Sequence, residues 1–242
     1  MLEMFQDIKS PISSSELQIL LKELYGDDVT NEMFVEATLE NKDAHLNLII
    51  LDDIVSGYII WFIEKEVEEE EELEEIITTI ILTIDEIVVL PEKQNVENAK
   101  KIIGKIDELA KKNDCSIGEI TLPSQSFWLI PTLTTIGDYN VAILRVSKEL
   151  EKKTEFVGIF NKIQNDPKPE IIELMVSKED VFQLEIIEEP TDYKKILESG
   201  YNPEIVSMIF NVEENNEEKL LNDVNKITEW QEYSFSLIKY FK

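Results

Sequence analysis

The segment that decides the fold reads Ile76-Ile77-Thr78-Thr79-Ile80-Ile81-Leu82-Thr83-Ile84-Asp85-Glu86-Ile87-Val88-Val89-Leu90-Pro91. Its β-branched residues favour a strand, and the apolar run 84–90 suits burial on both faces of a sheet. Pro91 ends the strand because proline cannot donate to a ladder. Apolar residues then recur at helical spacing: Ala99, Ile102, Ile103, Ile106, Leu109 and Ala110. The sequence therefore predicts a strand, a turn and an amphipathic helix that ends near Lys112.

The turn between strand and helix reads Gln94-Asn95-Val96-Glu97-Asn98-Ala99. With the preceding Val89-Leu90-Pro91, it resembles the acyl-CoA-binding turn of the GNAT family of N-acetyltransferases. In that family a strand ending in Val-x-Pro precedes the motif Gln/Arg-x-x-Gly-x-Gly/Ala. The resemblance implies that backbone N–H groups of this turn would face a cofactor pyrophosphate. Glu97 stands where the family has its first glycine.

The flanking elements have the same order as in that family. Periodicity predicts helices at 15–25 and 31–39, strands at 45–51 and 55–66, a strand at 117–122, a short helix at 126–135 and a strand at 139–147. We therefore expect a mixed α/β fold, with a degenerate GNAT-like domain over 1–149. The acidic run Glu68–Glu72 is interpreted as part of a surface extension of a hairpin, since consecutive like charges repel.

For the remainder of the chain, 150–242, the pattern of apolar residues predicts a smaller α+β domain of no named family. Its candidate strands are 156–163, 170–175, 181–187, 205–212 and 233–241, and its candidate helices are 190–199 and 217–227.

Glu97 decides the expected function. A carboxylate about 4 Å from a phosphate costs on the order of 4 kcal/mol at an effective dielectric near 20. An acid in the first turn also stabilises the helix dipole, so we expect the Glu97 carboxylate to occupy the place of the lost ligand among the amides. None of Gln94, Asn95, Val96, Glu97, Asn98 and Ala99 is then expected to bind a cofactor, and no cofactor is expected.

Few residues qualify as catalytic groups. The resemblance places a general-acid tyrosine four residues before a Gly-Phe pair; if Gly137 is that glycine, the positions hold Leu133 and Asp138. Asp85 or Glu86 on the central strand could act as a general base, although surface acids are the simpler interpretation. No catalytic residue is predicted.

His45 and Cys115 are the only residues of their kinds. A zinc site needs more ligands of these types, and Cys–His catalysis needs the two in contact. We therefore predict no metal site. A single cysteine excludes an intramolecular disulfide and favours a reducing interior, either of a host cell or of a virion.

The composition argues against a nucleic-acid-binding, membrane-spanning or secreted protein. The chain has 51 acidic and 23 basic residues, a formal net charge of -28 and a single arginine, Arg145. Such a chain is repelled by nucleic acid. Apolar runs are strand-sized, and the N-terminus lacks a basic region before an apolar one, so neither a membrane span nor a signal peptide is predicted.

Three functions stay open. The first is a non-catalytic interaction or assembly protein on a GNAT-like fold, as occurs by analogy among virion and other complex subunits. The second is an active acyl-CoA-dependent N-acetyltransferase with a displaced Glu97. The third is an acidic DNA mimic that occupies a basic partner. A protein partner of unknown identity is expected in the first and the third.

Overall fold

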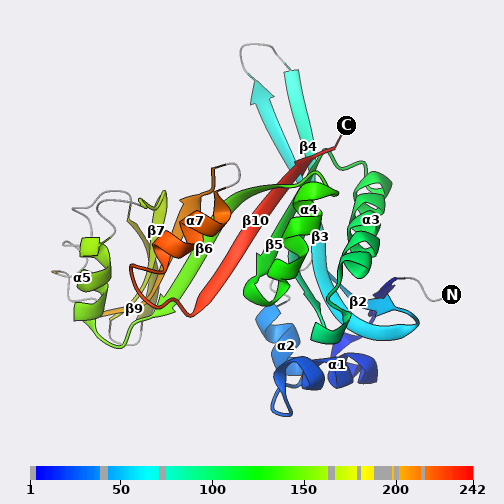
Figure 1. Cartoon of the computed structure of the whole chain (residues 1–242), viewed down its shortest axis with the longest axis horizontal. Helices are drawn as coiled ribbons and strands as arrows, with labels where there is room; N and C mark the ends of the chain where they lie inside the picture. Colours follow the sequence, from blue (N-terminus) through cyan, green and yellow to red (C-terminus); the bar gives the residue numbers. More distant parts are fainter. Residues whose placement is uncertain are drawn as a thin grey trace. The chain divides into compact units, whose positions relative to one another are not determined.

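The computed structural model describes residues 4–38, 43–70, 75–162, 167–178, 181–187, 198, 202–213 and 216–241. The chain forms two compact units (Figure 1). The first unit comprises Met1–Asn140 and Leu237–Lys242, and the second comprises Val141–Ser236. The second unit is therefore an insertion in the chain of the first, whereas the sequence suggested two consecutive domains, 1–149 and 150–242. That domain assignment stays a prediction.

The first unit contains a mixed sheet with helices on both faces. Its strands are β1 (Phe5–Asp7), β2 (His45–Leu51), β3 (Ile54–Glu70), β4 (Glu75–Val89), β5 (Ile117–Pro123) and the end of β10 (Glu232–Tyr240), in that spatial order. Its helices are α1 (Ser15–Tyr25), α2 (Asn31–Thr38), α3 (Val96–Lys112) and α4 (Ile130–Thr135), with 3₁₀ turns η1 (Pro11–Ser13), η2 (Pro91–Lys93) and η3 (Ser124–Leu129).

Helices α1 and α3 begin where the sequence supplies a capping side chain. The Ser14 side chain accepts a hydrogen bond from the Leu17 amide at the start of α1, which satisfies one of the free amides of a helix N-terminus. Helices α1 and α2 cover one face of the sheet through a core formed by Leu17, Leu20, Leu21, Phe34, Leu46, Leu48, Ile50, Tyr58, Ile60, Val88 and Leu90. The buried residues of α3 cover the other face (Figure 1).

Strands β4 and β5 are the parallel pair of this sheet, and they separate. Their ladder joins Ile81–Ile84 to Ile117–Ile120. Strand β4 continues to Val89 and β5 to Pro123, beyond the last pair of that ladder. The two strands therefore diverge at the end from which α3 and η3 begin, and backbone groups of β4 become available to other partners there.

The second unit contains β6 (Asn140–Glu149), α5 (Lys153–Lys162), β7 (Ile171–Lys178), β8 (Val181–Ile187), β9 (Asn202–Asn211), α7 (Glu217–Val224) and the first part of β10. Its spatial order is β10-β6-β9-β7-β8, with antiparallel ladders from β6 to β9, from β9 to β7 and from β7 to β8. The buried side chains of α5 are Phe156, Ile159 and Phe160.

The predicted mixed α/β fold and the GNAT-like element order are confirmed, because α1, α2, β2, β3, β4, α3, β5, α4 and β6 follow one another as expected. One prediction is wrong: 156–163, predicted as a strand, lies mostly in helix α5. Its buried residues recur three and four positions apart, a helical period in a short apolar run that also fits a strand. The predicted helix 190–199 lies outside the described residues, apart from Glu198. None of the described helices is both long and apolar enough to cross a membrane.

Candidate functional site

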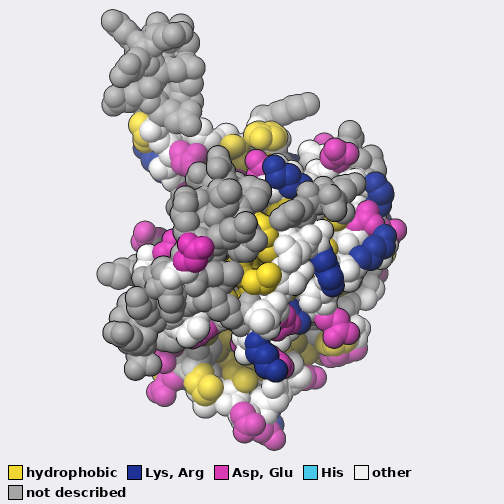
Figure 2. All heavy atoms as spheres, turned by 90° about the vertical axis from the view of Figure 1, so that its left-hand side faces the viewer, with side chains coloured by type: hydrophobic (Ala, Val, Ile, Leu, Met, Phe, Trp, Pro, Cys, Tyr) yellow, Lys and Arg dark blue, Asp and Glu magenta, His cyan; other side chains and the backbone are white. Residues whose placement is uncertain are grey.

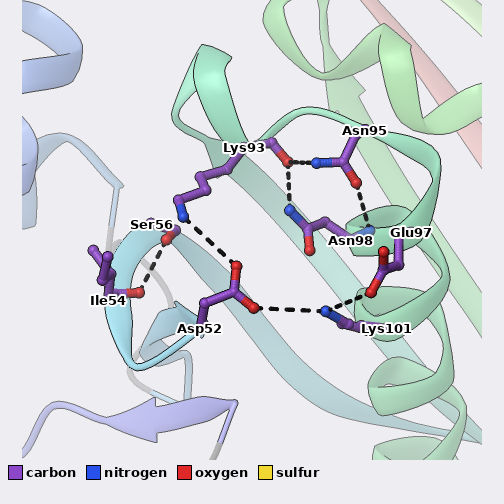
Figure 3. Close-up of polar contacts among 8 residues, drawn as sticks. All are labelled: Asp52, Ile54, Ser56, Lys93, Asn95, Glu97, Asn98 and Lys101. Atoms are coloured by element: carbon purple, nitrogen blue, oxygen red, sulfur yellow. Dashed lines mark hydrogen bonds and ion pairs between the residues drawn. The ribbon is translucent and has the colours of Figure 1, made fainter.

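The segment Gln94–Ala99 runs from the end of η2 into the first turn of α3, and its Asn95 caps the helix (Figure 3). The Asn95 side-chain oxygen accepts a hydrogen bond from the Asn98 amide at 3.0 Å. The Asn98 side chain in turn donates to the Lys93 carbonyl at 2.9 Å. One of the amides that a helix N-terminus would offer to an anion is therefore already occupied by a side chain of the protein.

The expected position of Glu97 is wrong. Its side chain is 81% exposed, and its carboxylate lies 3.1 Å from the Lys101 ammonium, one turn further along α3 (Figure 3). A glutamate pairs readily with a lysine four positions later, since both project from the same helix face. This hydrogen bond raises the pKa of Lys101. Thus Asn95 caps one amide of the helix terminus, and the Glu97 carboxylate pairs with Lys101.

Asp52 brings a second carboxylate to this turn from the β2–β3 hairpin. Its two oxygens lie 3.7 Å from Lys93 Nζ and 3.7 Å from Lys101 Nζ. Asp52 and Asp53 form the two-residue loop, and both have positive φ, 54° and 62°, the pattern of a type I′ turn. The lysines Lys93 and Lys101 are thus matched by two carboxylates, Asp52 and Glu97, and the turn carries no excess positive charge.

The gap between β4 and β5 is bridged by side chains. Ser126 of η3, which is buried, donates to the Ile87 carbonyl. The Gln94 amide group donates to the Val89 carbonyl at 2.9 Å and lies 3.4 Å from the Gln125 carbonyl. Both acceptors belong to β4 beyond its last pair with β5. Backbone acceptors that face the gap are therefore satisfied from within the protein.

A cavity of about 400 Å³ lies on the α1–α2 face of the same strands. It is lined by Ala37, Thr38, Ala44, Phe62, Asp85, Glu86, Thr121 and Pro123. Asp85 is exposed and Glu86 is half-buried. Burial raises the pKa of Glu86, opposed by a hydrogen bond from Tyr58 and assisted by the charge of Asp85. Of the two predicted base candidates, Glu86 is thus the more buried one, and burial raises its pKa.

Tyrosine hydroxyls extend this site inward. The Tyr25 and Tyr58 oxygens lie 2.5 Å apart, so one donates to the other. Tyr25 also bonds the Gln125 side chain, and Tyr58 bonds Glu86. Burial raises the pKa of both phenols, which keeps them neutral donors at physiological pH. The sequence analysis did not identify Tyr25, Tyr58 or Gln125, because they come from α1, β3 and η3 and share no motif.

The other predicted positions bring no donor to the gap. Leu133 is buried, and its carbonyl would lie 2.7 Å from a Cβ at Gly137. Only glycine therefore fits this bend, and a buried leucine cannot transfer a proton. His45 stacks on Trp61 with ring centroids 4.3 Å apart, while Cys115 is a buried free thiol. The described residues contain no group of three or more His, Cys, Asp or Glu that could hold a metal ion.

No protein-family model and no curated protein matches this sequence. Similar solved structures include a GCN5-related N-acetyltransferase from Anabaena variabilis, 11% identical over 98% of this chain and 72% of that chain, with a TM-score of 0.45. An IAA acetyltransferase from Bacillus cereus is 11% identical over 86% of this chain and 98% of its own, with a TM-score of 0.37. A ribosomal-protein-alanine N-acetyltransferase from Brucella melitensis is 17% identical over 50% and 82%, with a TM-score of 0.35.

Proposed function

We propose that this protein is a non-catalytic interaction or assembly protein built on a GNAT-like fold, in which the acyl-CoA site has been lost. The observation that carries the proposal is the pair of hydrogen bonds across the gap between β4 and β5, from Ser126 to the Ile87 carbonyl and from Gln94 to the Val89 carbonyl. An extended, amide-containing cofactor arm entering this gap would pair with such backbone groups. It would first have to displace both side chains.

The charge of the turn supports the same proposal. A pyrophosphate is held by free amides and by unmatched positive charge. Here Asn95 caps one amide, and the carboxylates of Asp52 and Glu97 offset the charges of Lys93 and Lys101. These residues do not fit the group, so no catalytic step is assigned through it.

The test is a calorimetric titration of the full chain with acetyl-CoA. We expect no binding at up to about 1 mM, the weak end of specific affinities. Wild-type binding at micromolar strength would overturn the proposal. Glu97→Gly alone is expected to leave acetyl-CoA unbound, because the β4 carbonyls stay occupied. Glu108→Gly is the matched control, since it removes an exposed glutamate from the same helix.

The assembly setting has its own test. A structural component of a complex would be present in a fixed ratio to its partner, so co-purification from native material should yield a partner in fixed ratio. If the chain purifies alone at native concentration and salt, the assembly role is wrong, whatever the result with acetyl-CoA.

An active acyltransferase is the second candidate, and the cavity beside Glu86 favours it. A half-buried carboxylate with a raised pKa, bonded to Tyr58, has the character of a general base. The same acetyl-CoA titration separates the candidates, because an acyltransferase must bind its cofactor. The DNA-mimic alternative has less support, since acidic side chains lie scattered among basic and apolar ones on the face drawn in Figure 2.

A further inference from the structure

Strands β3 and β4 extend beyond their neighbours as a two-stranded arm. The ladder between β2 and β3 ends at the pair His45 and Trp61, and the ladder between β4 and β5 begins at Ile81 and Ile117. Pairing between β3 and β4 nevertheless continues to Glu70 and Glu75. We define the arm as 62–70 with 75–80; Figure 1 shows it extending beyond the neighbouring strands of the first unit.

The outer edge of β3 in this arm, the edge away from β4, has no partner among the described strands. Beyond Trp61, the described strands pair with β3 only through β4, on its other edge. An isolated two-stranded hairpin is only marginally stable in water, and an unpaired edge is a template for another strand. The arm therefore offers a row of backbone donors and acceptors at an edge to which the described part of the chain supplies no further strand.

Acidic side chains line one face of the arm at strand spacing. Glu64 and Glu66 are both exposed, and residues two apart in a strand project from the same face about 6.8 Å apart. Lys65 alternates to the other face. Glu64 accepts a hydrogen bond from Thr83 at 3.3 Å, and this donor is uncharged.

Glu119 of β5 adds to this acidic row. Its strand partner is Thr83, which pairs with Phe62 at the base of the arm. Besides burial, the charges of Glu64 and Glu66 raise the pKa of Glu119. The three carboxylates thus repel one another, and a positively charged ligand would relieve that repulsion.

We propose that the outer edge of β3 in the arm binds an extended basic segment of a partner protein as an added strand. Lysine or arginine side chains at alternate positions of that segment would contact Glu64 and Glu66, and main-chain hydrogen bonds would fix the register. A second copy of this chain is the poorer occupant, because each copy carries a net charge of -28. This inference rests on the proposed function as an interaction protein and adds the chemistry of the partner.

The test uses a seven-residue synthetic peptide of alternating lysine and valine, added to the full chain and followed by fluorescence anisotropy. A peptide of the same charge with proline in place of each valine is the probe control, since proline cannot complete a ladder. We expect the valine peptide to bind and the proline peptide to bind at least about tenfold more weakly. Equal affinity for the two peptides would show charge attraction alone and would overturn strand addition.

Matched variants locate the contact. Glu64→Gln with Glu66→Gln should weaken binding of the valine peptide about tenfold, as expected for close charge pairs. Glu23→Gln with Asp28→Asn removes two exposed acids near the end of α1 and should change affinity less than about twofold at physiological salt. Equal losses in both variants, or no binding by the wild type, would mean that the acids only protect the edge from aggregation.

Hydrogen exchange supplies an independent readout. The peptide should protect amides between Phe62 and Glu70, and protection elsewhere without protection there would contradict the proposal. The acetyl-CoA titration on the same sample keeps the two proposals apart. A chain that binds neither ligand loses only the docking proposal, whereas a chain that binds acetyl-CoA loses the proposed function whatever the peptide does.

Discussion

The Asn95 side chain accepts a hydrogen bond from the Asn98 amide at 3.0 Å, and so satisfies one of the free amides at the N-terminus of α3. The Glu97 carboxylate lies beside Lys101 instead. One amide of this helix terminus is therefore capped by an uncharged side chain, and the nearby lysines are paired with carboxylates.

Asn95→Ala should lower the free energy of unfolding by about 1 kcal/mol, because it removes the N-cap of α3. Asn95→Ser should retain most of the stability, since serine accepts the same hydrogen bond. Urea denaturation of the two variants measures the difference. Equal stability of the alanine and serine variants would show that the cap contributes nothing.

Ser126→Ala should cost about 1–3 kcal/mol, because a buried carbonyl acceptor on β4 loses its donor. Thr83→Ala, which removes an exposed hydroxyl–carboxylate contact, should change stability by less than about 0.5 kcal/mol. The denaturation midpoints of the two variants, compared with that of the wild type, measure both changes in stability. A Ser126→Ala variant as stable as the wild type would indicate that the gap between β4 and β5 is not held closed by this bond.

Glu86 should make stability depend on pH. Burial raises its pKa above the ordinary 4.5, so the folded state favours the neutral form. The resulting stability is fully present below the unfolded pKa and is lost as pH rises through the higher folded pKa. The free energy of unfolding of Glu86→Gln, relative to wild type, should therefore increase with pH across this window.

Urea titrations of both proteins from pH 4 upward check this expectation, with Glu23→Gln as a control for the loss of one exposed acid. A constant difference between wild type and Glu86→Gln at all pH values would contradict a raised pKa. A difference of the opposite sign would mean that Glu86 is stabilised as the anion.

Lys239 and Asp107 should couple the last residues of the chain to α3. Lys239 Nζ lies 2.8 Å and 2.9 Å from the two Asp107 oxygens and 5.2 Å from the centre of the Tyr139 ring. A double-mutant cycle with Lys239→Ala and Asp107→Ala should give a coupling of about 1–2 kcal/mol. A coupling near zero would show that this half-buried pair behaves like an exposed one.

Local elements were predictable because periodicity and caps are properties of neighbouring residues. The α3 stripe from Ala99 to Ala110 specified its helix, and the β-branched run of β4 specified its strand. In 153–162 the same reasoning failed, since an apolar run of that length fits both periods. The three residues of β1 gave too short a pattern to be recognised.

The sequence by itself determined the mixed α/β fold, the element order and the turn whose glycine is replaced by Glu97, because each is encoded within one short segment. Only the tertiary structure decided which groups meet. In the folded chain the Glu97 carboxylate pairs with Lys101, and Asp52 from another hairpin pairs with the same lysine. Ser126 donates a hydrogen bond to a β4 carbonyl, and the end of β10 belongs to the first unit. Such contacts join residues far apart in the chain, so they depend on how strands and helices pack and not on any local pattern.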